Sequence, residues 1–152
     1  MYLPIQNYCE TLVKNFSNIA PERKLLLEKL ASYITSKQKL KTTVNLIYIC
    51  THNSRRSHFG QVWAKVASDY YQIKNVQTFS GGTEVTAFNI NAINALKRLG
   101  FNIETSTAEK NSTYKVSYSD KNESLLCFSK VYNDSHNPKN EFAAIMTCGD
   151  AE

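Results

Sequence analysis

Two residues six positions apart, Cys50 and Arg56, are the side chains of this sequence best suited to covalent chemistry. A cysteine thiolate is a strong nucleophile, and a guanidinium offers a planar fork of N–H donors that suits a tetrahedral oxyanion. Ser57 follows directly, and its hydroxyl can donate to the thiolate and so lower the pKa of the thiol. The sequence therefore predicts a site in which a thiolate attacks an anion held by an arginine.

The segments around Cys50 and Arg56 are of the kind that such a site needs. Residues 44–49 form an apolar run typical of a strand, and a helical pattern covers residues 57–71. A strand-to-helix turn directs backbone N–H groups and the positive end of the helix dipole at one point. A cysteine at a strand end is often just a buried apolar residue, but two neighbouring arginines disfavour its burial. We expect the intervening residues to bind the oxyanion: Thr51, His52, Asn53, Ser54 and Arg55.

Strand-like and helix-like segments alternate along the rest of the chain. A second strand is expected at residues 76–80, a helix near residues 89–99, and a third strand at residues 142–148. Such an order predicts parallel strands joined by right-handed crossovers, with the site at their carboxyl ends. Three polar residues stand at such ends: Cys50, Ser80 and Cys148. The third strand is apolar almost throughout, which predicts that both of its faces are covered.

Residues 1–41 differ in character and are expected to form a helical extension to an α/β domain at residues 42–152. Apolar residues recur there at helical spacing, and we favour helices that pack on the sheet of the same chain over a hairpin that docks a partner. Residues 105–140 are rich in Ser, Asn, Lys and Tyr and are expected to form an excursion with one short apolar piece at residues 125–128. Four polar residues of this excursion are candidates either for the rim of the site or for solvated loop: Ser129, Lys130, Tyr132 and His136.

The composition argues against several classes of protein. The chain has 152 residues and a formal net charge of +5, but its lysines are spread out and accompany no nucleic-acid-binding motif. No apolar run is long enough to span a membrane, and the N-terminus lacks the pattern of a secretory signal. The four cysteines are scattered without a Cys-x-x-Cys pair, which argues against a disulfide scaffold or a zinc site and favours a reducing cytoplasm.

Several segments resemble the low-molecular-weight protein tyrosine phosphatase superfamily, which includes the thioredoxin-coupled arsenate reductases. The resemblance rests on residues 44–57, 79–84, 89–100 and 143–151, and the last of these segments is most similar to the arsenate reductase branch. It implies a three-layer α/β/α fold with a parallel sheet. Three strands of that sheet are visible in this chain, and the family's fourth strand is absent.

The resemblance also implies roles for individual residues. Cys50 is the nucleophile, Arg56 binds the oxyanion, and Asn53 holds the loop in a left-handed turn. Ser80 matches a residue that hydrogen-bonds this asparagine in the family, although it can equally be a strand-end cap. The resemblance also carries Ser57 over as the residue that helps the thiolate to leave.

Three positions near the loop depart from the family or need comment. His52 stands where the phosphatases usually carry glycine, and Arg55 stands where many relatives carry a second cysteine. The arginine adds positive charge and removes a thiol partner from the loop. His58, at the start of the predicted helix, is expected to point to solvent.

Cys148 is the second cysteine of interest. In arsenate reductases of this type, a cysteine at the end of the third core strand attacks the adduct of the first cysteine and releases arsenite, and thioredoxin reduces the final disulfide. Residues 147–152 resemble the segment around that cysteine, and the alternative is a reduced cysteine that merely ends a buried strand. Cys9 and Cys127 are expected to be structural.

Two features of the family do not follow Cys148 in this sequence. They are a third relay cysteine and the Asp-Pro loop whose aspartate serves as general acid. This pattern leads us to expect a truncated chain.

Three functions remain open from the sequence. The first is an arsenate reductase-like enzyme that uses Cys50 and Cys148 with a thioredoxin-type reductant and no bound cofactor. The second is a protein tyrosine phosphatase that acts through a phosphocysteine intermediate. The third is a catalytically incomplete module that binds a small oxyanion.

Overall fold

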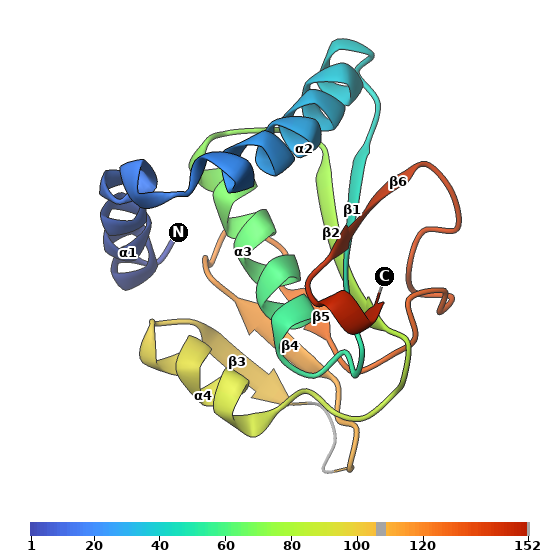
Figure 1. The fold of residues 1–152 in the computed structure, drawn as a ribbon. Helices are drawn as coiled ribbons and strands as arrows, with labels where there is room; N and C mark the ends of the chain where they lie inside the picture. Colours follow the sequence, from blue (N-terminus) through green and yellow to red (C-terminus); the bar gives the residue numbers. More distant parts are fainter. Residues whose placement is uncertain (106–108, 152) are drawn as a thin grey trace.

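Three parallel strands form the central sheet in the order β2-β1-β6 (Figure 1). They are β1 (Val44–Cys50), β2 (Val76–Gly82) and β6 (Phe142–Met146) of a computed structural model that describes residues 1–105 and 109–151. Because Cys50 pairs with Gly82, the carboxyl ends of β1 and β2 are level. The α/β class and the parallel sheet expected from the sequence are confirmed.

Helices α2 (Pro21–Lys39) and α3 (Arg56–Tyr70) flank this sheet. From α2, Leu30, Tyr33 and Ile34 pack against a buried cluster on the strands made of Val44, Leu46 and Val76. The preferred expectation, that helices near the N-terminus pack on the chain's own sheet, is confirmed for α2.

The first helix, α1 (Leu3–Lys14), lies against α3 rather than on the sheet. Its buried residues Ile5 and Cys9 join the larger core, which also holds Val62 and Val66 of α3. A short 3₁₀ turn (Phe16–Asn18) lies between α1 and α2 in the chain.

A second, antiparallel sheet was not foreseen in the sequence. It contains β3 (Asn102–Thr105), β4 (Tyr114–Ser117) and β5 (Leu125–Cys127) in that order, beside α4 (Ile90–Arg98) (Figure 1). These strands have only three or four residues each, too few to show a clear alternation of apolar and polar residues. The sheet is nevertheless part of the core, because Val116 and Cys127 are fully buried.

The prediction that β6 is covered on both faces is wrong. Ala144 and Met146 are exposed, and the other residues of β6 are only half-buried. The reason is that β6 is an edge strand of the sheet, with a neighbouring strand on one side only, so its apolar residues are not all buried. Among the residues that the structure describes, no helix is long and apolar enough to cross a membrane.

Candidate active site

The loop between β1 and α3 has the geometry expected of an oxyanion cradle. Cys50 is the last residue of β1, and α3 begins six residues later at Arg56. Asn53 adopts a left-handed conformation with φ 41°, as predicted, and so folds the loop back over the end of β1. Gly82 permits the close packing of β2, because a Cβ there would lie 2.6 Å from the Thr51 carbonyl oxygen and 2.7 Å from the Asn53 nitrogen.

A short chain of hydrogen bonds leads from the thiol to the base of the loop. The Cys50 Sγ lies 3.0 Å from the Ser57 Oγ, and the Asn53 side-chain amide donates to the same hydroxyl oxygen at 2.8 Å. With its oxygen accepting from Asn53, the Ser57 hydroxyl is left free to donate its proton to the sulfur. The donor that Ser57 was expected to provide is therefore in place.

The electrostatics of the loop favour the thiolate. Burial by itself would raise the pKa of the Cys50 thiol, but the Ser57 hydroxyl and the backbone N–H groups of Ser57, Ser54 and Asn53 outweigh it. The pKa of Cys50 is consequently held below its ordinary value. A lowered pKa increases the fraction of the thiolate, which is the form that attacks an electrophilic centre.

Cys50 is buried, with 3% of its surface exposed, although two adjacent arginines were expected to prevent this. The expectation fails because Arg55 and Arg56 are themselves exposed and so keep their charges in contact with solvent while Cys50 is buried. Both arginines line an open cavity of about 410 Å³ together with Cys50, His52, Ser54 and Phe59. The cavity therefore combines a thiol with the side chains of two arginines.

The remaining loop residues are fixed by neighbouring segments. The Ser54 hydroxyl donates to the Ala87 carbonyl at 2.8 Å, and the Glu84 N–H donates to the Thr51 carbonyl at 2.8 Å. The His52 imidazole lies 3.5 Å from the Glu84 carboxylate at the exposed rim. The loop is therefore held open before any ligand arrives.

Ser80 does not hydrogen-bond Asn53, contrary to the expectation from the resemblance. Its hydroxyl donates to Gln61 Oε1 at 2.7 Å and lies 3.1 Å from His58 Nδ1. The Asn53 side-chain oxygen instead accepts from the backbone N–H of Lys130 at 2.9 Å.

His58 is fully buried, so the prediction that it points to solvent is wrong. Its ring stacks at 4.1 Å on Phe88, and burial together with the charge of Lys130 lowers its pKa to about 3. The spacing could have shown this, since His58 shares a helix face with the buried residues Gln61, Val62 and Val66.

The supports that sequence reasoning did not identify come from the far end of the excursion. Besides the Lys130 N–H, the Ser129 hydroxyl donates to the His52 carbonyl at 3.0 Å and accepts from the Thr86 N–H at 2.9 Å. Ser129 and Lys130 were candidates for the rim, yet both are buried beneath the loop. No local signal marks these contacts, because they join residues 77 positions apart.

Cys148 follows β6 and reaches the same end of the sheet. Its Sγ lies 3.5 Å from the hydroxyl of Thr51, the residue next to Cys50, and the side chain is half-buried. Thr147 anchors this segment, with its N–H and its hydroxyl each 2.8 Å from the Ile49 carbonyl oxygen. The fold thus places Cys148 beside Thr51, which lies 97 positions earlier in the sequence and directly follows Cys50.

The other two cysteines are buried away from this loop. Burial raises the pKa of the Cys127 thiol to about 12 and also raises that of Cys9. Within residues 1–105 and 109–151, no group of His, Cys, Asp and Glu side chains is arranged to hold a metal ion.

Comparison with known proteins connects this chain to arsenate reductases. Over 64 residues it is 36% identical to arsenate reductase 2 of Staphylococcus haemolyticus (strain JCSC1435), a match that covers 41% of this chain and 45% of that protein. It is 33% identical over 64 residues to arsenate reductase of Bacillus subtilis (strain 168), covering 42% of this chain and 43% of that protein. The chain is therefore a distant and partial homologue of these proteins.

The matches span less than half the length of the curated relatives. No family model matches the chain. No solved structure matches it either.

Proposed function

We propose that this chain is an arsenate reductase-like enzyme in which Cys50 is the nucleophile and Cys148 is the relay thiol. The observation that carries the proposal is the position of Cys148, whose Sγ lies 3.5 Å from the hydroxyl of the residue adjoining Cys50. The lowered pKa of Cys50 and the distant similarity to arsenate reductases support the same assignment.

The proposed reaction has two covalent steps. The Cys50 thiolate attacks the arsenic of arsenate, water leaves after protonation of one oxygen, and an S–As bond forms while Arg56 and the loop N–H groups hold the remaining oxygens. The Cys148 thiolate then attacks the Cys50 sulfur. A Cys50–Cys148 disulfide forms, the S–As electron pair passes to arsenic, and As(V) leaves as arsenite, As(III). A dithiol reductant of the thioredoxin type returns the disulfide to two thiols.

The test is a single-turnover experiment with arsenate and no added reductant. We expect about one equivalent of arsenite per protein, together with a Cys50–Cys148 disulfide detected by peptide mass spectrometry. Cys148→Ser should produce no arsenite while arsenate still protects Cys50 from alkylation, and Cys50→Ser should lose both effects. Cys127→Ser is the matched control and should behave as the wild type. Full arsenite production by Cys148→Ser would exclude the relay role.

A phosphotyrosine phosphatase is the second candidate, favoured by one observation. Phe59 lines the cavity above Cys50 and offers an aromatic surface to a phenyl ring. In this case Cys50 attacks phosphorus and water later hydrolyses the phosphocysteine. Hydrolysis of p-nitrophenyl phosphate that depends on Cys50 and is unchanged in Cys148→Ser would support the phosphatase over the reductase. Binding of phosphate without turnover of either substrate would support the oxyanion-binding module.

A further inference from the structure

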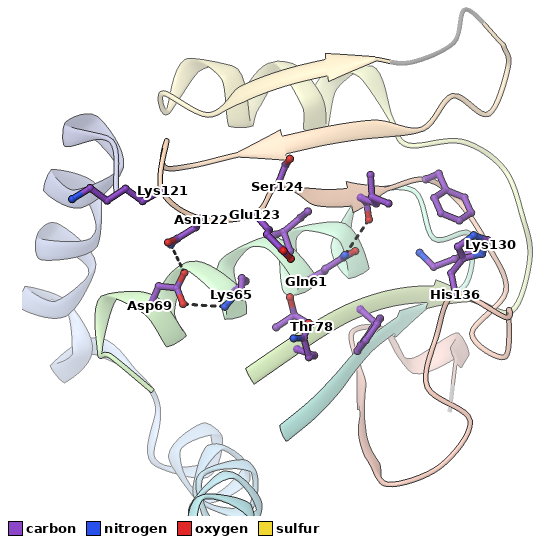
Figure 2. Close-up of a pocket in the computed structure, with 15 residues that line it drawn as sticks. Gln61, Lys65, Asp69, Thr78, Lys121, Asn122, Glu123, Ser124, Lys130 and His136 are labelled. Atoms are coloured by element: carbon purple, nitrogen blue, oxygen red, sulfur yellow. Dashed lines mark hydrogen bonds and ion pairs between the residues drawn. The ribbon is translucent and has the colours of Figure 1, made fainter. Parts of the chain in front are cut away.

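A second cavity, of about 550 Å³, lies between α3, β2 and the segment from residue 121 to residue 128 (Figure 2). None of the loop residues 50–57 lines it, so it is separate from the oxyanion cavity. Its size suits a small-molecule ligand. The antiparallel sheet contributes to one wall, because Leu125 and Leu126 of β5 are among the residues that line the cavity.

One end of the cavity holds a buried ammonium group without an acceptor. Lys130 is 4% exposed, and its Nζ lies 4.4 Å from the centroid of the Phe128 ring. No hydrogen bond or ion pair among the described residues reaches this nitrogen. The Asp134 carboxylate attracts Lys130 electrostatically but makes no ion pair with it, and its Oδ1 is engaged by the imidazole of His136 at 2.7 Å and by the His136 N–H at 2.9 Å. Burying an ammonium group without a hydrogen-bond acceptor is unfavourable, and burial is the main cause that lowers the pKa of Lys130.

At the opposite end of the cavity, the Asp69 carboxylate already has hydrogen-bond and ion-pair partners. Figure 2 shows Asp69, Lys65 and Asn122 there, with Lys130 and His136 at the other end. The Asp69 carboxylate accepts from Lys65 at 3.0 Å and from Asn122 and Tyr118 at 2.6 Å each. Lys121 and Glu123 also line the cavity, but both are exposed to solvent, whereas Lys130 is buried. An incoming anion is therefore best placed at Lys130.

The lining around Lys130 combines apolar side chains with the His136 imidazole and with the hydroxyl of Thr78, which is buried without a hydrogen-bond partner. We propose that this cavity binds a small organic anion, whose charged group pairs with Lys130 and whose apolar body lies against Phe79, Phe128 and Leu126. The Thr78 hydroxyl is available to a polar atom of the same ligand.

An extended peptide fits the cavity less well, because the adjoining strand edges are already occupied. The Ser80 carbonyl accepts from Asn137, Gly82 pairs with Val131, and the Leu126 carbonyl accepts from Gln61. Strand addition needs a longer run of free backbone groups than these edges offer.

The proposal is tested by calorimetry and ligand-observed NMR with 4-phenylbutyrate and its neutral analogue 4-phenylbutanamide. The wild-type protein should bind the carboxylate, and Lys130→Met should weaken that binding about tenfold or more without affecting the amide. Leu126→Trp, which fills the cavity without touching Lys130, should abolish binding of both probes. Leu25→Trp is the matched control on an exposed site of α2 and should bind as the wild type.

Excess phosphate separates this site from the loop at Cys50. Phosphate should leave 4-phenylbutyrate bound, and Cys50→Ser should bind the probe normally. The proposal is overturned by displacement by phosphate, by equal binding to wild type, Lys130→Met and Leu126→Trp, or by no binding to the wild type at millimolar probe.

Discussion

At the scale of single residues, the candidate site depends on the groups that donate hydrogen bonds to the Cys50 sulfur. Ser57 contributes both a hydroxyl and a backbone N–H, and Asn53 orients the hydroxyl by occupying its oxygen. Cys50 and Ser57 were both identifiable from the sequence, because the Cys-x5-Arg-Ser pattern places them across one turn. The orientation of Ser57 was predictable only in part, since it depends on a contact between Asn53 and Lys130.

The Ser57→Ala substitution tests this arrangement. Removing the hydroxyl takes away the largest contribution that lowers the pKa of Cys50, so this pKa should rise towards its ordinary value. The pH at which iodoacetamide alkylation of Cys50 is half-maximal should shift upward by about one unit. Ser68→Ala, further along the same helix, should leave the profile unchanged, and an unshifted profile in Ser57→Ala would contradict the assignment.

His58 leads to a prediction about stability and pH. Its pKa is lowered to about 3 in the folded protein, against an ordinary value of 6.5. Between these two pH values the unfolded chain therefore binds a proton at this histidine that the folded chain does not bind. Stability is therefore retained above pH 6.5 and falls as the pH is lowered towards 3, by at most about 1.4 kcal/mol per pH unit.

The measurement is urea unfolding of wild type and His58→Gln between pH 7 and pH 4. The difference in unfolding free energy between the two proteins should shrink as the pH falls. The control is His52→Gln, which changes an exposed histidine. Its unfolding free energy plotted against pH should run parallel to that of the wild type. Parallel curves for wild type and His58→Gln would show that His58 is not buried in its neutral form.

At the scale of elements, the segment Ser129 to Tyr132 fixes the loop to β2. It meets the loop through the His52 carbonyl and Asn53, and it meets the strand through Gly82, whose N–H and carbonyl bond Lys130 and Tyr132 at 2.9 Å each. Strand β1 and helix α3 were predictable because apolar periodicity is a local property. This bracing segment was not, because its polar composition resembles that of a solvated loop.

We predict that Ser129→Ala weakens both the fold and the loop. The change removes the acceptor of the Thr86 N–H and the donor to the His52 carbonyl. The loss of these two hydrogen bonds should lower the free energy of unfolding by about 1–3 kcal/mol. Cys50 alkylation at pH 7 should slow as the loop loosens. Chemical denaturation and alkylation rates measure the two effects, with Ser32→Ala on the exposed side of α2 as a control.

At the scale of the whole molecule, α3 links the two hydrophobic clusters. Val62 and Val66 belong to the core shared with α1, α4 and the antiparallel sheet, while Ala64 packs against the cluster under α2. The N-terminal helices contribute to both clusters. The packing of α2 on the sheet was expected from the sequence, whereas the contact of α1 with α3 was not, because it joins distant segments.

The molecule should therefore unfold in one cooperative step. Trp63 is the single tryptophan and packs against the larger core, so its fluorescence reports on that cluster, whereas far-ultraviolet circular dichroism reports on all helices. The two signals should give the same midpoint in urea. Separate transitions would show that residues 1–41 form a unit of their own.

Asn53 combines three demands that few amino acids meet together. The position needs a backbone tolerant of φ 41°, an acceptor for the Lys130 N–H and a donor for the Ser57 oxygen. Glycine meets only the first of these three demands. Aspartate lacks the donor and places a negative charge beside the thiolate. In a library of all substitutions at this position, selected for Cys50 reactivity, asparagine should be recovered almost alone. Mutational tolerance at this position should thus be narrow because its side chain supports Ser57 and Lys130, independently of any contact with the substrate.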